Sequence, residues 1–168
     1  MSERIRLWLR WGELIAMCVL IFVFSSFEAH DSTEQSNFIV DRIIALLFDN
    51  YAKYSVPKQE ALYSLLIVLV RKGAHFSEYA LLAVLAFGAF VRIKRHSLRW
   101  LAAVGFAFVY ACSDELHQTF VPGRAGMFRD VVVDTSGAAC GALLACFISL
   151  MILARRVLRS QQKDAKAE

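Results

Sequence analysis

The sequence lacks the short motifs that identify several common enzyme and nucleic-acid-binding classes. It contains no glycine-rich phosphate loop, no Gly-x-Ser-x-Gly nucleophile elbow and no nucleic-acid-binding motif. The net charge of +4 does not point to nucleic acid either. Its basic residues flank apolar segments, where such residues orient helices and meet anionic lipid headgroups.

Cysteine is scarce and shows no metal-type spacing. All four cysteines lie in apolar runs, so we expect free thiols packed in helices: Cys18, Cys112, Cys140 and Cys146. A zinc site is conceivable by ligand type from His75, Asp114, His117 and Asp130. No tight local ligand motif accompanies these residues, so we expect no metal and no cofactor.

Hydrophobic residues are abundant: they make up 58% of the 168 residues, and the mean hydropathy is +0.49. A soluble domain is usually nearer half apolar, so the excess indicates a membrane protein. Four segments approach the roughly 20 apolar residues that cross a bilayer, namely 11–27, 73–91, 98–118 and 131–153. The predicted fold is all-α: one domain over 1–168, an integral membrane bundle of four transmembrane helices, with a disordered tail at 160–168.

Positive charge assigns these segments to the two sides of the membrane. Basic clusters precede the first segment, separate the second from the third and follow the fourth: Arg4, Arg6 and Arg10; Arg92, Lys94, Arg95 and Arg99; Arg155, Arg156, Arg159, Lys163 and Lys166. All three clusters are cytoplasmic if both termini are inside, and loop 28–60 is then outside. The first segment resembles a signal sequence, but no small-x-small cleavage site follows it, so we interpret it as a retained anchor.

The outer loop is predicted to contain an amphipathic helix. Apolar residues recur at helical spacing over 37–50, as in a helix that lies on a membrane face. After Pro57, segment 61–91 would be longer than a perpendicular span requires if it forms one helix. It must then tilt, or 61–70 must lie at the interface or protrude.

Polar side chains form stripes on the predicted membrane helices. Lys72, His75 and Tyr79 are spaced three and four apart, so they share one helix face, and Glu78 can border the same stripe. Ionisable groups in a membrane helix are expensive and mark functional sites by default. This stripe is therefore a candidate site.

The third segment carries a second polar face. Asp114, His117 and Gln118 share that face by the same spacing rule, whereas Glu115 is turned away by about 100°. Glu115 can therefore point at a neighbouring helix instead. The turn that follows this segment presents Arg124.

The fourth segment begins beside Arg129 and Asp130. Asp130, Asp134, Gly137 and Gly141 again fall on one face, and the two glycines allow another helix to approach closely. The topology places the polar groups of three helices toward the outer side. We therefore expect one outward-facing polar cavity surrounded by Lys72, His75, Asp114, Glu115, Gln118, Arg124 and Asp130.

These stripes are also the places where the chain resembles the VanZ-like family of bacterial integral membrane proteins. The resemblance covers roughly 11–150 and lies in four motifs: Phe24-Ser25-Ser26, Arg71 to Tyr79, Ser113 to Gln118 with Pro122-Gly123-Arg124, and Asp130 to Asp134 with Gly137 and Gly141. It implies a multi-pass protein of the bacterial cytoplasmic membrane, related to a namesake associated with teicoplanin resistance. Many relatives have Asn in place of Asp134, which favours a neutral hydrogen-bonding role at that position.

Three functions are compatible with the expected cavity. In the first, Lys72, Arg124 and Arg129 hold an anionic or phosphate-bearing lipid headgroup, and His75 exchanges protons with Asp114 or Glu115. The remaining candidate ligand-binding residues are Tyr79, Gln118, Asp130 and Asp134. The second is a non-catalytic envelope factor that binds through the same cavity. The third is proton-coupled transport, for which four helices leave little room unless the protein forms a homo-oligomer.

Overall fold

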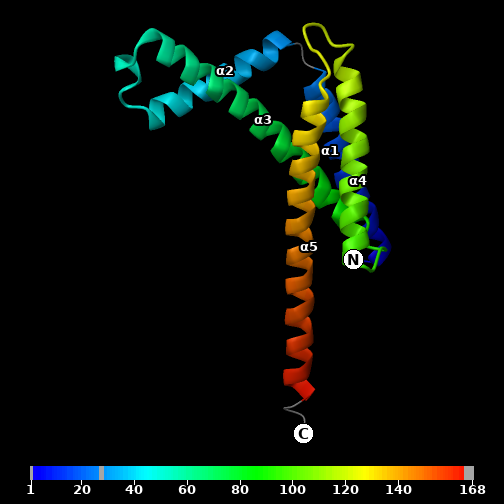
Figure 1. Ribbon diagram of the computed structural model, residues 1–168. Coiled ribbons are helices and arrows are strands. Elements are labelled where there is room, and N and C mark those ends of the chain that lie inside the picture. The colour runs from blue at the N-terminus through cyan, green and yellow to red at the C-terminus, as the bar shows by residue number, and fades with distance from the viewer. Residues whose placement is uncertain (1, 27–28, 165–168) are drawn as a thin grey trace.

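The computed structural model describes residues 2–26 and 29–164, and its regular secondary structure in these ranges is entirely helical (Figure 1). Its elements are α1 (Glu3–Ser25), α2 (Ala29–Leu47), a short 3-10 turn η1 (Tyr51–Lys53), α3 (Val56–Ala89), α4 (His96–Gln118) and α5 (Phe128–Asp164). The described ranges contain no strand. The all-α prediction is confirmed.

The bundle consists of α1, the second half of α3, α4 and the first half of α5 (Figure 1). The start of α1 and the turn between α3 and α4 lie at one end, and the loop between α4 and α5 lies at the other. At the first end, Arg10 Nη1 donates a hydrogen bond to the Gly88 carbonyl at 3.3 Å, and the Arg99 guanidinium lies over the Phe87 ring at 4.0 Å. Two of the predicted basic clusters therefore meet at the same end.

The core is built from small residues that let the helices approach closely. Buried alanines line α3, α4 and α5, and Tyr79, Leu82 and Phe87 fill the remaining space. The closest approach joins α3 and α5, where Gly137 faces the Phe76 carbonyl and Gly141 faces the Ala80 carbonyl. A Cβ at either glycine would overlap that carbonyl, so glycine is required for this packing.

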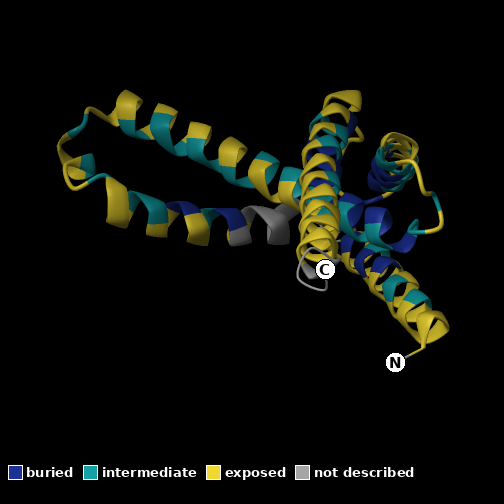
Figure 2. Cartoon of the chain, turned by 90° about the horizontal axis from the view of Figure 1, so that it is seen from below, coloured by how far each residue is buried: buried dark blue, intermediate teal, exposed yellow. Residues whose placement is uncertain are grey.

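The outer surface of the bundle is apolar. Large hydrophobic side chains are exposed along α1, α4 and α5, and Figure 2 shows burial confined to the inward helix faces. Apolar exposure on this scale marks a membrane or partner surface. Among the described residues, α1 and residues Phe128–Gln162 of α5 are long and apolar enough to cross a membrane. The predicted total of four spans remains a prediction.

The region between α1 and the bundle half of α3 forms an arm. Helix α3 is continuous over 34 residues, and its first half leaves the bundle beside α2 (Figure 1). Segment 61–91 is therefore helical as one piece as far as Ala89, and the placement of 61–70 relative to the membrane stays a prediction. The amphipathic helix predicted at 37–50 is present, but it begins earlier, at Ala29, and ends at Leu47.

The structure bears on the predicted ends of the first and last helices. Helix α1 ends at Ser25, and residue 27, the predicted end of the first span, lies outside the described residues. Helix α5 continues to Asp164, so the disorder predicted for 160–168 is wrong for 160–164. Residues 165–168 are not among those described. The helix continues because no Pro or Gly interrupts 142–164. The four cysteines are free thiols in helices, but Cys112 and Cys140 are exposed rather than packed as predicted.

Replacing Gly141 with Ala should destabilise the protein, because the added methyl group would press on the Ala80 backbone rather than on a flexible side chain. Overpacking of this kind costs about 1–3 kcal/mol. Gly105→Ala is the matched control, since open space surrounds that position, and it should be neutral or stabilising by about 0.5–1 kcal/mol. Thermal unfolding in detergent measures both variants. Equal unfolding temperatures would contradict the close approach of α3 and α5.

Cysteine accessibility tests the predicted orientation in a background without native cysteines. Lys53→Cys, in the turn of the arm, should react only with reagent added outside the cell. Lys94→Cys, between α3 and α4, should react only after the reagent reaches the cytoplasm, because its basic cluster is retained there. The reverse pattern would invert the topology.

Candidate functional site

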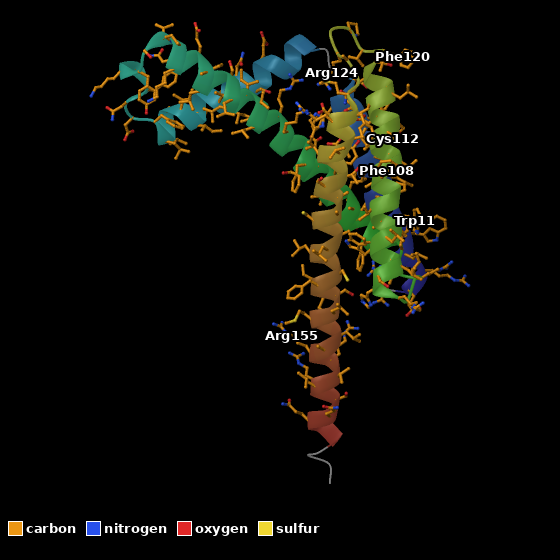
Figure 3. All side chains as sticks on the ribbon, in the orientation of Figure 1. Trp11, Phe108, Cys112, Phe120, Arg124 and Arg155 are labelled. Carbon is orange, nitrogen blue, oxygen red and sulfur yellow. The ribbon has the colours of Figure 1, made fainter. Side chains whose placement is uncertain are left out.

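Two adjoining cavities lie between the end of the bundle and the base of the arm. Their volumes are about 170 and 320 Å³, and they share three lining residues, Arg71, His75 and Arg124. Figure 3 labels Arg124 at the end of the bundle from which the arm projects. The shared residues make one cationic wall between the cavities.

The first cavity has an apolar side and a polar side. Ile21, Phe24, Ile39 and Val70 provide apolar surface from α1, α2 and α3. The polar lining, besides the shared wall, is Ser25, Ser36, Glu78 and Asp114. Such a cavity suits an amphiphilic group rather than a purely polar one.

The second cavity lies between α3 and the loop that joins α4 to α5. Ile67, Val68 and Met127 form its apolar side. On its polar side, Lys72 forms an ion pair with Asp130 at the start of α5. That contact neutralises Lys72 and leaves the shared arginines as the open cations of this cavity.

The spacing of residues in α3 explains how one helix serves both cavities. Arg71, His75 and Glu78 are four and three residues apart, so they lie on one face of the helix. Lys72 borders that face on the side of the second cavity. Neither Arg71 nor Glu78 was selected as a site residue from the sequence, although this spacing could have identified both.

Asp114 and Gln118 share one face of α4, as predicted, and they connect α4 to α1. Gln118 Nε2 donates to Ser25 Oγ at 3.0 Å and to Asp114 Oδ2 at 3.1 Å. All three residues are buried. Ser25 was not selected as a site residue from the sequence, because nothing in the sequence indicates which helix faces it.

His117 is occupied elsewhere. Its Nε2 lies 3.1 Å from Ser26 Oγ, and its ring packs against Phe22 with the ring centroids 4.6 Å apart. It lines neither of the two adjoining cavities. His117 therefore helps to attach α4 to α1.

Tyr79 and Asp134 lie behind the cavity walls. Both residues are 0% exposed and line neither adjoining cavity. Among the described residues, Asp134 faces the imidazole of His75, whose Nδ1 lies 3.8 Å from Asp134 Oδ1. This separation exceeds hydrogen-bond length, so Asp134 can orient His75 only through a small movement or electrostatically.

Glu115 and Arg129 lie outside the two cavities. Glu115 Oε2 accepts a hydrogen bond from the Met127 amide at 2.7 Å, and the residue lines a separate, shallow cavity beside Thr119 and Phe128. Arg129 is exposed and lines none of the three cavities. The single cavity expected from the sequence is thus two adjoining ones, and Glu115 is directed away from His75.

The charges of the shared wall are not neutralised by contact with any residue that the structure describes. Neither Arg71 nor Arg124 forms an ion pair with any residue that the structure describes, and Arg124 Nε is buried without a hydrogen-bond partner there. Burial, followed by the proximity of Arg71, lowers the pKa of the Arg124 guanidinium from its ordinary value. A bound anion would stabilise both charges. The described residues contain no group of three or more acidic, His or Cys side chains arranged for a metal.

The site lies within a region that matches a known protein family. The family described as VanZ/LLP1 matches residues 11–152, which include every residue that lines the two adjoining cavities. No curated protein and no solved structure matches the chain. The match covers well over half of the chain, whereas the chemistry of the site rests on the residues described above.

Replacing Gln118 with Leu tests the connection between α1 and α4. The change leaves Ser25 Oγ and Asp114 Oδ2 buried without their donor, and an unsatisfied buried polar group costs about 1–3 kcal/mol. Gln59→Leu is the matched control, because Gln59 lies in the arm and its side-chain amide bonds the Tyr51 and Tyr54 carbonyls there. Chemical unfolding should show the larger loss for Gln118→Leu. A smaller loss would mean that the network does not stabilise the bundle.

Proposed function

The chain belongs to the VanZ-like family, and we propose that it is a cell-envelope membrane protein whose polar site binds the phosphate-bearing headgroup of a membrane lipid. The proposal places the protein in the bacterial cytoplasmic membrane with both termini inside. A link to the response to glycopeptides such as teicoplanin is part of the proposal and rests on the family alone.

The observation that carries this proposal is the pair of arginines in the shared wall. Arg71 and Arg124 line both cavities and have no ion-pair partner among the described residues. A guanidinium group presents a rigid fork of donors that matches phosphate oxygens, and charge-assisted hydrogen bonds to phosphate are strong. A phosphate at this wall would satisfy both side chains.

The apolar sides of the cavities favour a lipid over a soluble phosphate. Ile21 and Phe24 line the first cavity, and Ile67 and Val68 line the second. They belong to helices whose outer surfaces are also apolar. A ligand whose headgroup reaches the arginines can therefore leave its acyl chains along a hydrophobic surface.

A reaction on the bound lipid is the second candidate function, and the position of His75 favours it. His75 lines both cavities together with the arginines, where an imidazole can exchange a proton with a bound phosphate ester. Asp114 lines the same cavity, whereas Glu115 does not. The proton-transfer role thus falls to His75 with Asp114.

The packing below the site argues against transport. Beneath the cavities the helices meet through Leu82, Ala83, Ala86 and Ala107, all fully buried. A proton-coupled transporter needs polar groups along its path. Binding from one side of the membrane fits this core better.

Lipid retention by purified variants tests the phosphate proposal. Arg124→Ala removes one fork of donors, and the loss of charge-assisted hydrogen bonds worth about 1.5–3 kcal/mol should weaken binding about 10- to 100-fold. Arg155→Ala is the matched control, because this arginine is exposed on the distal part of α5 (Figure 3) and should leave retention unchanged. Native mass spectrometry measures the lipid retained by each. Equal retention by Arg124→Ala and wild type would refute the phosphate site.

The same preparations distinguish binding from catalysis. If a reaction occurs, His75→Gln should abolish product formation while most lipid binding remains, and Glu115→Gln should retain activity because its side chain bonds the Met127 amide outside the cavities. Lipid products are measured by mass spectrometry. Bound lipid without product from wild type would identify a non-catalytic binder. Loss of product only in Glu115→Gln would reassign the base.

A further inference from the structure

We propose that the headgroup bound at the arginine wall also carries a primary ammonium group, as phosphoethanolamine does, and that Glu78 and Asp114 hold this ammonium in the first cavity. The inference rests on the proposed phosphate site and adds the second charged group of the ligand. It predicts a zwitterionic headgroup rather than a purely anionic one.

The distribution of charges between the cavities is the first argument. The second cavity has one carboxylate, Asp130, which is paired with Lys72. The first cavity has two carboxylates, Glu78 and Asp114, and neither forms an ion pair with any described residue. Beyond the shared arginines, the first cavity is therefore acidic. A ligand with phosphate at the wall and a cation beside it matches this order of charges.

The second argument is that Asp114 is held in place through one carboxylate oxygen, while its other oxygen lacks a hydrogen-bond partner among the described residues. The residue is only 4% exposed, and Gln118 fixes its Oδ2 through the 3.1 Å hydrogen bond. Gln118 is itself held by Ser25. Oδ1 is buried and has no partner among the described residues. Buried carboxylate oxygens are normally hydrogen-bonded, so this oxygen calls for a donor from a ligand.

Glu78 supplies the second carboxylate from the neighbouring helix. It lies one turn beyond His75 on the cavity-lining face of α3 and is half-buried. Glu78 and Asp114 are close enough to repel each other electrostatically, and the positive charge of Arg124 offsets part of that repulsion. When a phosphate engages Arg124, a cation between the two carboxylates would take over this role.

An ammonium group fits this position better than the alternatives do. The two hydroxyl groups of a glycerol headgroup can donate to the carboxylates, but they bring no positive charge. A quaternary ammonium brings charge but has no N–H to donate to Asp114 Oδ1. A primary ammonium brings one positive charge and three donors. It can therefore bond both carboxylates while the phosphate reaches the arginines.

Titration of the purified full-length protein with four short-chain lipids of identical acyl chains tests the inference. The headgroups are phosphoethanolamine, phosphocholine, phosphoglycerol and phosphate alone. The phosphoethanolamine lipid should bind at least about tenfold more tightly than the other three, because charge-assisted hydrogen bonds to two carboxylates add to those of the arginines. Water-soluble phosphoethanolamine, as a competitor, distinguishes a lipid ligand from a free one: a lipid site should require a large excess of it.

Glu78→Gln should lower the affinity for the phosphoethanolamine lipid by about 10- to 100-fold and leave the phosphoglycerol lipid unaffected. Glu13→Gln, at an exposed position of α1, is the matched control and should change neither. Equal or tighter binding of the phosphoglycerol lipid by wild type would overturn the ammonium site, as would an equal loss for both lipids in Glu78→Gln. Either result leaves the phosphate site standing if Arg124→Ala still weakens all four lipids. Loss of that arginine effect would remove the phosphate site itself.

Discussion

The close contact between α3 and α5 is the constraint on which the rest of the structure depends. Gly137 and Gly141 bring α5 against the carbonyls of Phe76 and Ala80, with no room for a side chain between them. This approach sets the depth at which the two polar stripes meet, so that Lys72 reaches Asp130 at the upper end of the contact. Van der Waals packing of small residues can stabilise such an interface in an apolar environment, where the hydrophobic effect between helices is absent.

The position of the site follows from where this contact ends. Along it, α3 and α5 are close enough that only glycine fits at 137 and 141. Above it, α3 leaves the bundle with the arm, and the space that opens is lined by Arg71, His75 and Arg124. The arm thus has a structural consequence: by diverging, it exposes one polar face of α3 to a cavity on either side. The same divergence places apolar residues of α2 and α3 beside the charged ones, which is the arrangement an amphiphilic ligand needs.

Within the site, the charges differ in how far they are already satisfied. Lys72 and Asp130 neutralise each other, and Gln118 occupies one oxygen of Asp114. The two shared arginines form no ion pair with any described residue, although Asp114, Glu115 and Glu78 act on Arg124 from a distance, and a partly buried charge is unfavourable without a contacting counter-charge. Binding a ligand of matching charge would relieve this condition. The proposed phosphate and ammonium groups are the simplest chemistry that satisfies both signs at once.

The sequence by itself determined the α-helical class, the membrane character and the faces of individual helices, because these depend on local composition and on the 3.6-residue period. It placed Lys72 and His75 on one stripe and indicated that Gly137 and Gly141 would admit a neighbouring helix. It could not show which helix each face meets. Only the tertiary structure decided that Ser25 bonds Gln118 and that Glu115 turns to the Met127 amide. It also divided the expected cavity into two. The physical reason is that a rotation of about 100° per residue fixes directions around one helix axis, whereas contacts across helices depend on how the axes pack.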